Sequence, residues 1–214
     1  LKKNFTSYRK EILLFFFPEE VKNLYFVDNR TTILCENAYH INSNFEYNFS
    51  KYRYFVSFLN KKISSSKKIK KTNKKLKVFV SRKLAKYRNF VNEKKLITFL
   101  KKRGFRIFYF EKENVINQFN IFKNSKIILT CHGSALTNLI ACDKKTKIIE
   151  IHSEFMTDNY SKLAKILSIK NYFNYLMRRD DPFLHFYENM FIKNKNKLIT
   201  KENLDDLETL INFK

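Results

Sequence analysis

Residues 127–151 read IILTCHGSALTNLIACDKKTKIIEI, and this stretch decides the predicted fold. The apolar run over 127–130 is rich in β-branched residues, which predicts a buried strand, and a glycine turn follows it. Residues 135–142 show the apolar spacing of a helix, and residues 147–151 form a second apolar run. A strand, a helix and another strand in such close succession are typical of a βαβ unit in a parallel sheet.

Further apolar runs continue this alternation along the chain. Some are short and rich in β-forming residues, which predicts strands at 78–80, 105–110 and 172–177. Others have helical spacing and lie at 92–104, 115–122 and 160–167. The first of these helices has Asn92 as a plausible N-cap and ends at Gly104, where a left-handed residue belongs. We therefore predict the α/β class, with a doubly wound, parallel, Rossmann-like sheet over residues 77–178.

The two ends of the chain lie outside this predicted domain. Near the start, short apolar runs separated by turn-prone residues predict strands at 12–17, 24–27 and 32–35. A helical stripe over 52–59 follows them. We interpret residues 1–60 as the end of a preceding lobe and a crossover, and residues 179–214 as a tail with a helix over 204–211. Because the chain begins with Leu rather than Met, we expect an upstream part to be missing.

The positive charge of the chain is concentrated in one region. The formal net charge is +23, and residues 47–92 hold fifteen basic residues and no acidic one. Lys61–Lys77 reads KKISSSKKIKKTNKKLK, which predicts an exposed lysine-rich loop over residues 61–76. Such a loop is attracted to an anionic membrane surface, a polyanionic glycan or nucleic acid. The alternative is a solvated loop without a partner.

Several protein classes are excluded or disfavoured by what the chain lacks. Its longest aliphatic and aromatic run, residues 12–17, is far short of the roughly 20 residues of a membrane helix. There is no G-x-G-x-x-G or Walker loop, and Ser134 lacks the G-x-S-x-G setting of a hydrolase nucleophile. The cysteines are interpreted as free thiols of a reducing cytoplasm: Cys35, Cys131 and Cys142. Three histidines share no metal-ligand spacing: His40, His152 and His185.

The most unusual strand end is His132-Gly133-Ser134, which follows the strand at 127–130 and leads directly into a helix. In an open parallel sheet, ligands bind beyond the carboxyl ends of the strands. A glycine turn at a helix N-terminus offers backbone N–H groups and the positive end of the helix dipole. This turn therefore predicts an anion site.

Two neighbouring strand ends add to this predicted site. Ser81 and Arg82 follow the strand at 78–80, with Arg88 a short distance beyond, and guanidinium groups match the geometry of phosphate. Glu150 lies in the predicted strand at 147–151, and a buried carboxylate one strand over suits the hydroxyls of a sugar. The residues alone thus predict a phosphorylated, ribose-bearing ligand, most simply a nucleotide. They do not indicate the reaction.

At these residues the chain resembles glycosyltransferase family 61, which includes bacterial capsular polysaccharide enzymes, plant xylosyltransferases and protein O-GlcNAc transferases. The resemblance rests on an ordered set of residues over 77–175: Ser81-Arg82, Arg88, Asn92-Glu93, Gln118, His132-Gly133-Ser134-Ala135-Leu136-Thr137-Asn138 and Glu150. Ser134 is a departure, because the family usually has Ala there.

The resemblance implies the C-terminal, donor-binding lobe of a two-lobed GT-B enzyme. It implies inverting transfer from a nucleotide sugar, usually UDP-linked, to a glycan acceptor of surface or capsular polysaccharide, without a metal or other cofactor. Arg82, Arg88 and the His132–Ser134 turn would hold the diphosphate, with Arg82 and His132 stabilising the leaving group. Asn138 and Glu150 would position the donor. The catalytic base would lie in the N-terminal lobe, and we name no residue for it.

Two other functions remain open at this point. A nucleic-acid-binding module is suggested by the charge and by the aromatic residues in KYRYF at 51–55, although no recognised reader motif is present, which disfavours it. A non-catalytic lobe that binds only a nucleotide is the other. For the transferase we expect a cytoplasmic protein that contacts the inner membrane through Lys61–Lys77.

Overall fold

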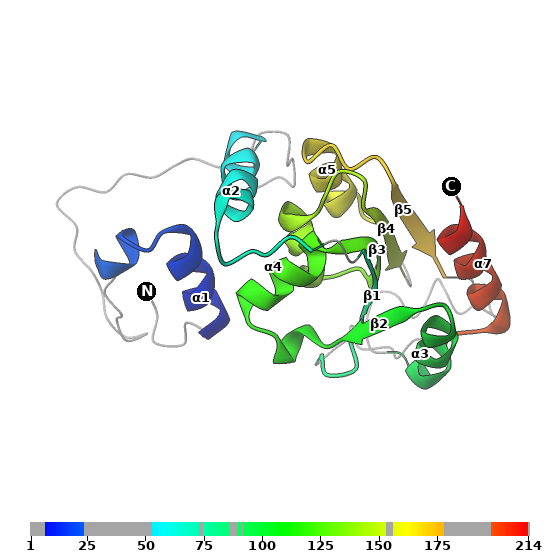
Figure 1. Ribbon diagram of the computed structural model, residues 1–214. Helices are drawn as coiled ribbons and strands as arrows, with labels where there is room; N and C mark the ends of the chain where they lie inside the picture. Colours follow the sequence, from blue (N-terminus) through cyan, green and yellow to red (C-terminus); the bar gives the residue numbers. More distant parts are fainter. Residues whose placement is uncertain are drawn as a thin grey trace, which may run out of the picture.

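The computed structural model describes residues 7–23, 53–72, 75–85, 90, 92–152, 156–177 and 198–213. Its centre is one sheet of five parallel strands in the order β2-β1-β3-β4-β5 (Figure 1). The strands are β1 (Leu76–Val80), β2 (Phe105–Phe108), β3 (Ser125–Cys131), β4 (Lys147–His152) and β5 (Tyr172–Leu176). The predicted α/β class and parallel sheet are confirmed.

The strand order reverses once along the chain. From β1 the chain moves outward to β2, then crosses back over β1 to β3, and continues to β4 and β5. In this order the reversal lies between β1 and β3, and the connections that leave the two strand ends run to opposite faces of the sheet. The β1 and β3 ends are therefore where a crevice is expected.

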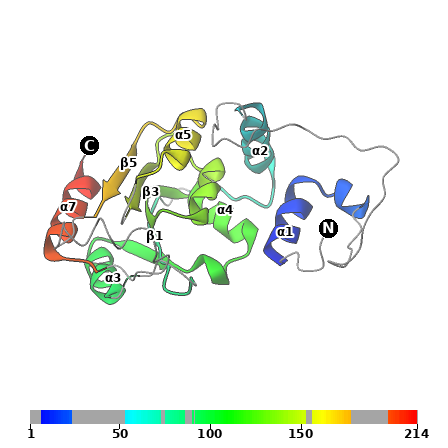
Figure 2. The same cartoon turned by 180° about the vertical axis from the view of Figure 1, so that it is seen from behind.

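Helices cover both faces of the sheet, as doubly wound topology requires. One face packs against α1 (Ser7–Phe16), α2 (Arg53–Ser65), α4 (Val115–Lys123), the 3-10 helix η4 (Ser134–Ala141) and α5 (Asn159–Ile166). The other face packs against α3 (Glu93–Lys102) and α7 (Lys201–Asn212), which lie side by side in Figure 2. Two short 3-10 helices, η1 (Glu20–Asn23) and η3 (Phe110–Lys112), complete the described elements.

Alternate residues of each strand supply the two cores. In β1, Val78 and Val80 face the α4 side, whereas Phe79 faces α3 and α7. All three are buried, and burying such a side chain fully stabilises the fold by about 1.5–3 kcal/mol. The continuous apolar runs of the sequence are thus explained by a sheet that is covered on both faces.

Of the two caps predicted for α3, the one at its C-terminal end is confirmed and the one at its N-terminal end is wrong. Gly104 has φ +79°, the left-handed conformation expected after the helix. Asn92 precedes α3 but makes no capping bond with its side chain. Instead its amide donates to the Ile199 carbonyl and its Oδ1 accepts from the Ile199 N–H, both at 2.8 Å. Asn92 therefore ties the segment before α7 to the start of α3.

The predicted strand at 12–17 is wrong, because these residues belong to helix α1 and the turn after it. A helix places Phe15 and Phe16 against Phe119 of α4, with ring centroids 5.3 and 5.9 Å apart. A short apolar run does not distinguish a strand from a helix, and here packing against α4 decides. The runs predicted as strands at 24–27 and 32–35 lie outside the described residues.

The predicted lysine-rich loop is shorter than its sequence suggests. Helix α2 continues through Ser65 with Ile63 fully buried, and β1 already begins at Leu76. Between them, residues 68–72 are held by two asparagines at the end of α4: Asn120 bonds the backbone of Lys68 and Lys70, and Asn124 that of Lys70 and Thr72. The described part of this segment is thus an exposed basic strip fixed to the domain. In the described residues, no helix is long and apolar enough to cross a membrane.

Candidate functional site

The candidate site lies at the carboxyl ends of β1 and β3, where the strand order reverses. Val80 pairs with Thr130, so the residues that follow this pair in the two strands, Ser81-Arg82 and Cys131-His132, lie at the same edge of the sheet. The next pair, Cys131 with Ile151, brings the end of β4 to the same edge. The sheet register therefore assembles the three strand ends that the sequence singled out.

A buried carboxylate shapes the turn after β1. The Ser81 hydroxyl lies 2.8 and 2.9 Å from the two carboxylate oxygens of Glu93, and the Arg82 N–H donates to the same group at 3.3 Å. Ser81 also accepts from the Lys83 N–H at 3.1 Å. Ser81 and Glu93 are both buried. The Ser81 hydroxyl therefore holds the turn that presents Arg82.

The guanidinium of Arg82 packs directly against Gly133. A Cβ atom built on Gly133 would lie 3.5 Å from Cζ of Arg82 and would overlap its Nη1 atom. The backbone of Gly133 is extended, with φ 162° and ψ 178°, so the glycine is needed for space and not for a left-handed conformation. The structure thus brings Arg82 and the His132–Ser134 turn together. Arg88 lies outside the described residues.

Behind this turn, His132 contacts a buried carboxylate. Nδ1 of His132 lies 2.6 Å from Oε1 of Glu150. The other oxygen, Oε2, accepts from the Tyr172 hydroxyl at 2.5 Å and lies 3.3 Å from Nε2 of His152. Nε2 of His152 also lies 3.0 Å from Oδ1 of Asn174. Three side chains thus converge on Glu150, which is fully buried.

These contacts keep Glu150 ionised. Burial by itself raises the pKa of this carboxyl, but hydrogen bonds from His132, His152 and Tyr172 outweigh it and lower the pKa to about 2. Burial also raises the pKa of Tyr172, and the neighbouring Glu150 carboxylate raises it further. At neutral pH the cluster is therefore a carboxylate that accepts from neutral or cationic donors.

A family comparison bears on this arrangement. The model of the family described as "Glycosyltransferase 61" matches residues 10–149, which is more than half of the chain. The chain belongs to glycosyltransferase family 61. The match covers the Arg82–Gly133 contact and ends one residue before Glu150. No curated protein matches the chain. Membership in a glycosyltransferase family implies a sugar donor and a glycan acceptor.

In this glycosyltransferase, Asn138 lies inside the domain and not at its surface. Its amide donates to Oε1 of Gln118 at 3.1 Å and to the Ala135 carbonyl at 3.0 Å, and the side chain is buried. Gln118 in turn donates to two carbonyls, those of Phe110 and Glu113. Asn138 therefore fixes η4 against α4. Ser134, the first residue of η4, is exposed at the start of that helix.

One histidine cluster has the composition of a metal site, and its ring geometry bears on that interpretation. His132, Glu150 and His152 offer ligand atoms that lie within 4.8 Å of one another. The two imidazoles are stacked, with centroids 5.3 Å apart and planes 25° apart. A metal ion lies near the plane of each imidazole that ligates it, and stacked rings do not share such a point. A carboxylate with two oxygens reaches both rings, so the arrangement fits a hydrogen-bonded network better than an ion.

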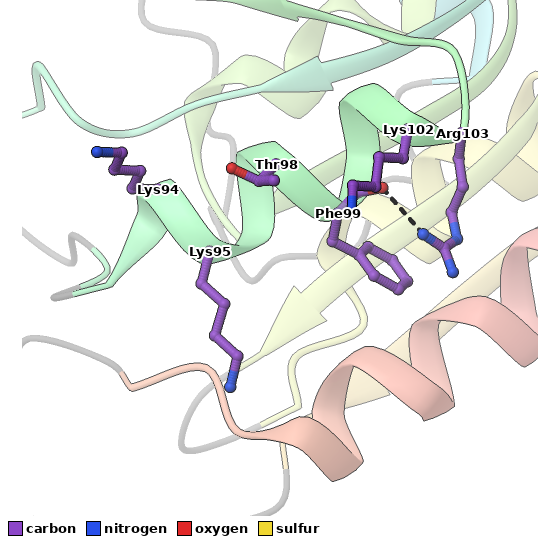
Figure 3. Close-up of a pocket in the computed structure, with 6 residues that line it drawn as sticks. All are labelled: Lys94, Lys95, Thr98, Phe99, Lys102 and Arg103. Atoms are coloured by element: carbon purple, nitrogen blue, oxygen red, sulfur yellow. Dashed lines mark hydrogen bonds between the residues drawn. The ribbon is translucent and has the colours of Figure 1, made fainter.

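A basic groove along α3 is a second place to look for a site. It is lined by Lys94, Lys95, Thr98, Phe99, Lys102 and Arg103 (Figure 3). Arg103 donates to the Phe99 carbonyl at 3.0 Å, lies 3.6 Å above the Phe99 ring and pairs with Glu208 of α7. The residues that line the groove come from α3 and the residue after it, and none of them lies at the end of a strand. The arginine of the groove, Arg103, is paired with Glu208 of α7. We interpret it as part of the α3–α7 interface.

Three members of the site are not predicted from the sequence. Glu93 belongs only to the motif of the family resemblance, His152 has no metal-ligand spacing, and Tyr172 is predicted only as part of a strand. One signal was available for His152. It lies two residues after Glu150 in the same strand, and alternate residues of a strand share a face. Nothing in the sequence indicates that Tyr172 reaches Glu150.

Proposed function

We propose that this domain binds a nucleotide-diphosphate sugar, UDP-linked, and transfers the sugar with inversion to a glycan acceptor in surface polysaccharide synthesis. The observation that supports this most is the packing of the Arg82 guanidinium against Gly133 at the point where the strand order reverses. In an open α/β sheet this point is the expected place for a nucleotide.

In this proposal, three groups hold the diphosphate. The Arg82 guanidinium offers paired donors to phosphate oxygens, and the first turn of η4 offers backbone N–H groups beside the exposed Ser134. His132 supplies a ring nitrogen from the same turn. Together they stabilise the charge that develops on the leaving nucleotide, a role that a metal ion plays in other transferases.

The reaction is a single displacement at the anomeric carbon of the sugar. The acceptor hydroxyl attacks this carbon, the bond from the carbon to the diphosphate oxygen breaks, and the nucleoside diphosphate leaves with the bonding electrons. The hydroxyl proton goes to a base, which we place in a preceding lobe of a GT-B architecture. Arg88 would add a second guanidinium to the leaving diphosphate. Asn138 contributes indirectly by fixing η4.

Calorimetric titration of the 214-residue chain with UDP tests the binding half of the proposal. Arg82→Ala removes the guanidinium, and we expect UDP affinity to fall about 100-fold, because a preorganised donor to such a charge contributes about 3 kcal/mol. Lys83→Ala is the matched control, since Lys83 is an exposed cation of the same turn, and it should change affinity less than threefold. Equal losses in the two variants would show that general charge, not this site, binds UDP.

We further propose that the protein is cytoplasmic. In this proposal the basic strip contacts the anionic surface of the inner membrane. The described lysines of α2 and of the segment after it are exposed: Lys61, Lys62, Lys67, Lys68, Lys70, Lys71 and Lys75. On the same helix, Tyr54 is 89% exposed and Phe55 is 50% exposed. Lysines beside exposed aromatic residues fit a membrane interface better than they fit a bare solvated loop. Salt-sensitive binding to RNA with none to vesicles would favour the nucleic-acid alternative instead.

A further inference from the structure

We propose that Glu150 is a positioning residue: with His152 and Tyr172 it fixes a proton on Nδ1 of His132, so that Nε2 of His132 is the atom that meets the donor diphosphate. The inference rests on the proposed function and deepens it. It gives Glu150 a role different from a direct contact with the ribose, and it assigns roles to His152 and Tyr172, for which the sequence suggested none.

The ionised state of Glu150 decides which of its neighbours donate a hydrogen bond. An ionised carboxylate only accepts hydrogen bonds. The pKa of Glu150 is about 2, so at neutral pH every neighbour at hydrogen-bond distance must supply the hydrogen. Nδ1 of His132, at 2.6 Å, is therefore an N–H group. A neutral imidazole carries one N–H, so Nε2 of the neutral ring is an acceptor, and Nε2 becomes a donor only when the ring is protonated.

The other oxygen of the Glu150 carboxylate has partners of its own. Oε2 of Glu150 already accepts from the Tyr172 hydroxyl at 2.5 Å, and Nε2 of His152 lies 3.3 Å away. Nε2 of His152 is also 3.0 Å from Oδ1 of Asn174, and its N–H is shared between these two oxygens. With His132 on the other oxygen, both oxygens of a fully buried carboxylate are engaged. Glu150 therefore acts through His132 and not on a sugar hydroxyl.

The orientation of the His132 ring is fixed by the backbone and by two neighbouring rings. The His132 backbone N–H donates to the Ile151 carbonyl at 2.9 Å, which fixes the main chain. The imidazole stacks on His152 at 5.3 Å and contacts Tyr160 at 5.4 Å between centroids. The two nitrogens lie on different sides of the ring, so Nε2 points away from Glu150. The side chain is still 24% exposed. A ring held in this way presents one nitrogen to a ligand.

The charged and titratable groups around the ring set the consequence for binding. Glu150 lies against Nδ1 of His132, and Tyr172 lies on the far side of that carboxylate. His152 and Tyr160 contact the ring. The Arg82 guanidinium lies beside the adjacent Gly133. Among these groups Glu150 carries the negative charge, and Nε2 of His132 points away from it. A protonated His132 donates from Nε2 to a phosphate oxygen, whereas the neutral ring presents a lone pair to it.

Nitrogen-15 NMR of the imidazole rings tests the proton position without any ligand. We expect His132 in the unmutated chain to be the Nδ1–H tautomer at alkaline pH, and His132→Gln assigns its signals. Glu150→Gln should abolish this preference, because the amide replaces the carboxylate that accepts from Nδ1. Tyr172→Phe leaves the carboxylate in place and should keep it. An Nε2–H tautomer in the unmutated chain would overturn the inference.

Binding of two probes tests the consequence. UDP carries a ribose and inorganic pyrophosphate does not. In Glu150→Gln, we expect the affinities for both probes to fall by a similar factor, because both probes meet Nε2 of His132 and the variant no longer fixes that ring. If Glu150 contacts the ribose, the variant will instead lose UDP affinity and keep pyrophosphate affinity unchanged, which would overturn the inference.

The proposed function fails in a different way. If neither UDP nor pyrophosphate binds the unmutated chain at any pH while the Nδ1–H tautomer is observed, the nucleotide-binding proposal is rejected and the proton assignment stands. The NMR measurement on the unmutated chain also needs no variant to fold, so it decides the assignment even if Glu150→Gln is unstable.

Discussion

Two turns of this molecule are each built on a buried glutamate, and they use it differently. In the turn after β1, Glu93 accepts from the Ser81 hydroxyl and from the Arg82 backbone N–H. In the turn after β3, Glu150 is surrounded by two imidazoles and a phenol. The partners of Glu93 are a hydroxyl and a backbone N–H, whereas an imidazole has two ring nitrogens, and the acceptor beside one of them selects the tautomer. A buried carboxylate that accepts from the backbone fixes the shape of a turn. One that accepts from an imidazole fixes which ring nitrogen carries the proton.

The largest expected effect is in the turn after β1. Glu93→Ala leaves the Ser81 hydroxyl and the Arg82 N–H without their buried acceptor, and it should lower the free energy of unfolding by about 3 kcal/mol, with UDP affinity falling as well. Urea denaturation at pH 7 measures the change. Glu111→Ala, at an exposed glutamate, is the control and should cost less than about 0.5 kcal/mol. A similar cost for both variants would mean that Glu93 does not hold this turn.

The pH dependence of stability should distinguish the two glutamates. The pKa of Glu150 is lowered from 4.5 to about 2, so its contribution to stability is present above pH 4.5 and is lost as the pH falls from there toward 2. By linkage this amounts to about 3 kcal/mol. Urea denaturation from pH 7 to 3 should show a smaller loss in Glu150→Gln than in the unmutated chain. Identical slopes would contradict the buried ionised state.

The two glycines of the chain separate binding from stability. In Gly133→Ala the new methyl displaces the flexible end of Arg82, so UDP affinity should fall at least about tenfold while stability changes by less than about 1 kcal/mol. Gly104→Ala should have the opposite pattern. Because φ of Gly104 is +79° and the space around it is open, the variant should lower the free energy of unfolding by about 1–2 kcal/mol and leave UDP affinity unchanged. Calorimetry and urea denaturation measure both. Parallel effects at the two positions would disprove the contact.

The smallest effect on the site is expected from charge outside both turns. Lys67→Glu with Lys68→Glu reverses two exposed charges of the basic strip and should change UDP affinity less than twofold. The same variant should lose most of its co-sedimentation with anionic vesicles, and neutral vesicles serve as the control. If UDP affinity falls as far as in Arg82→Ala, then long-range charge, and not the geometry of the two turns, binds the nucleotide.

Much of the site could be predicted because strand ends are local features. The apolar runs, Gly104 and Gly133 marked where elements begin and end, and parallel strands bring their carboxyl ends to one edge. Two elements, α1 and α2, differ from the prediction because distant residues decide them. Residues 12–17 form a helix because Phe15 and Phe16 pack on Phe119, far along the chain, and α2 extends through Ser65 because Ile63 is buried. The periodicity of a few consecutive residues gives no information about these long-range contacts.

The order of residues along the chain was sufficient to predict the alternation of strands and helices, the glycine turn after β3 and the family to which the chain belongs. Which groups meet at that turn depends on the fold. Ser81 bonds to Glu93, Asn138 bonds to Gln118 inside the domain, and Tyr172 reaches Glu150 because β5 pairs with β4. Periodicity follows from the geometry of the local backbone. Hydrogen-bond partners depend on the register between strands that lie far apart in the chain.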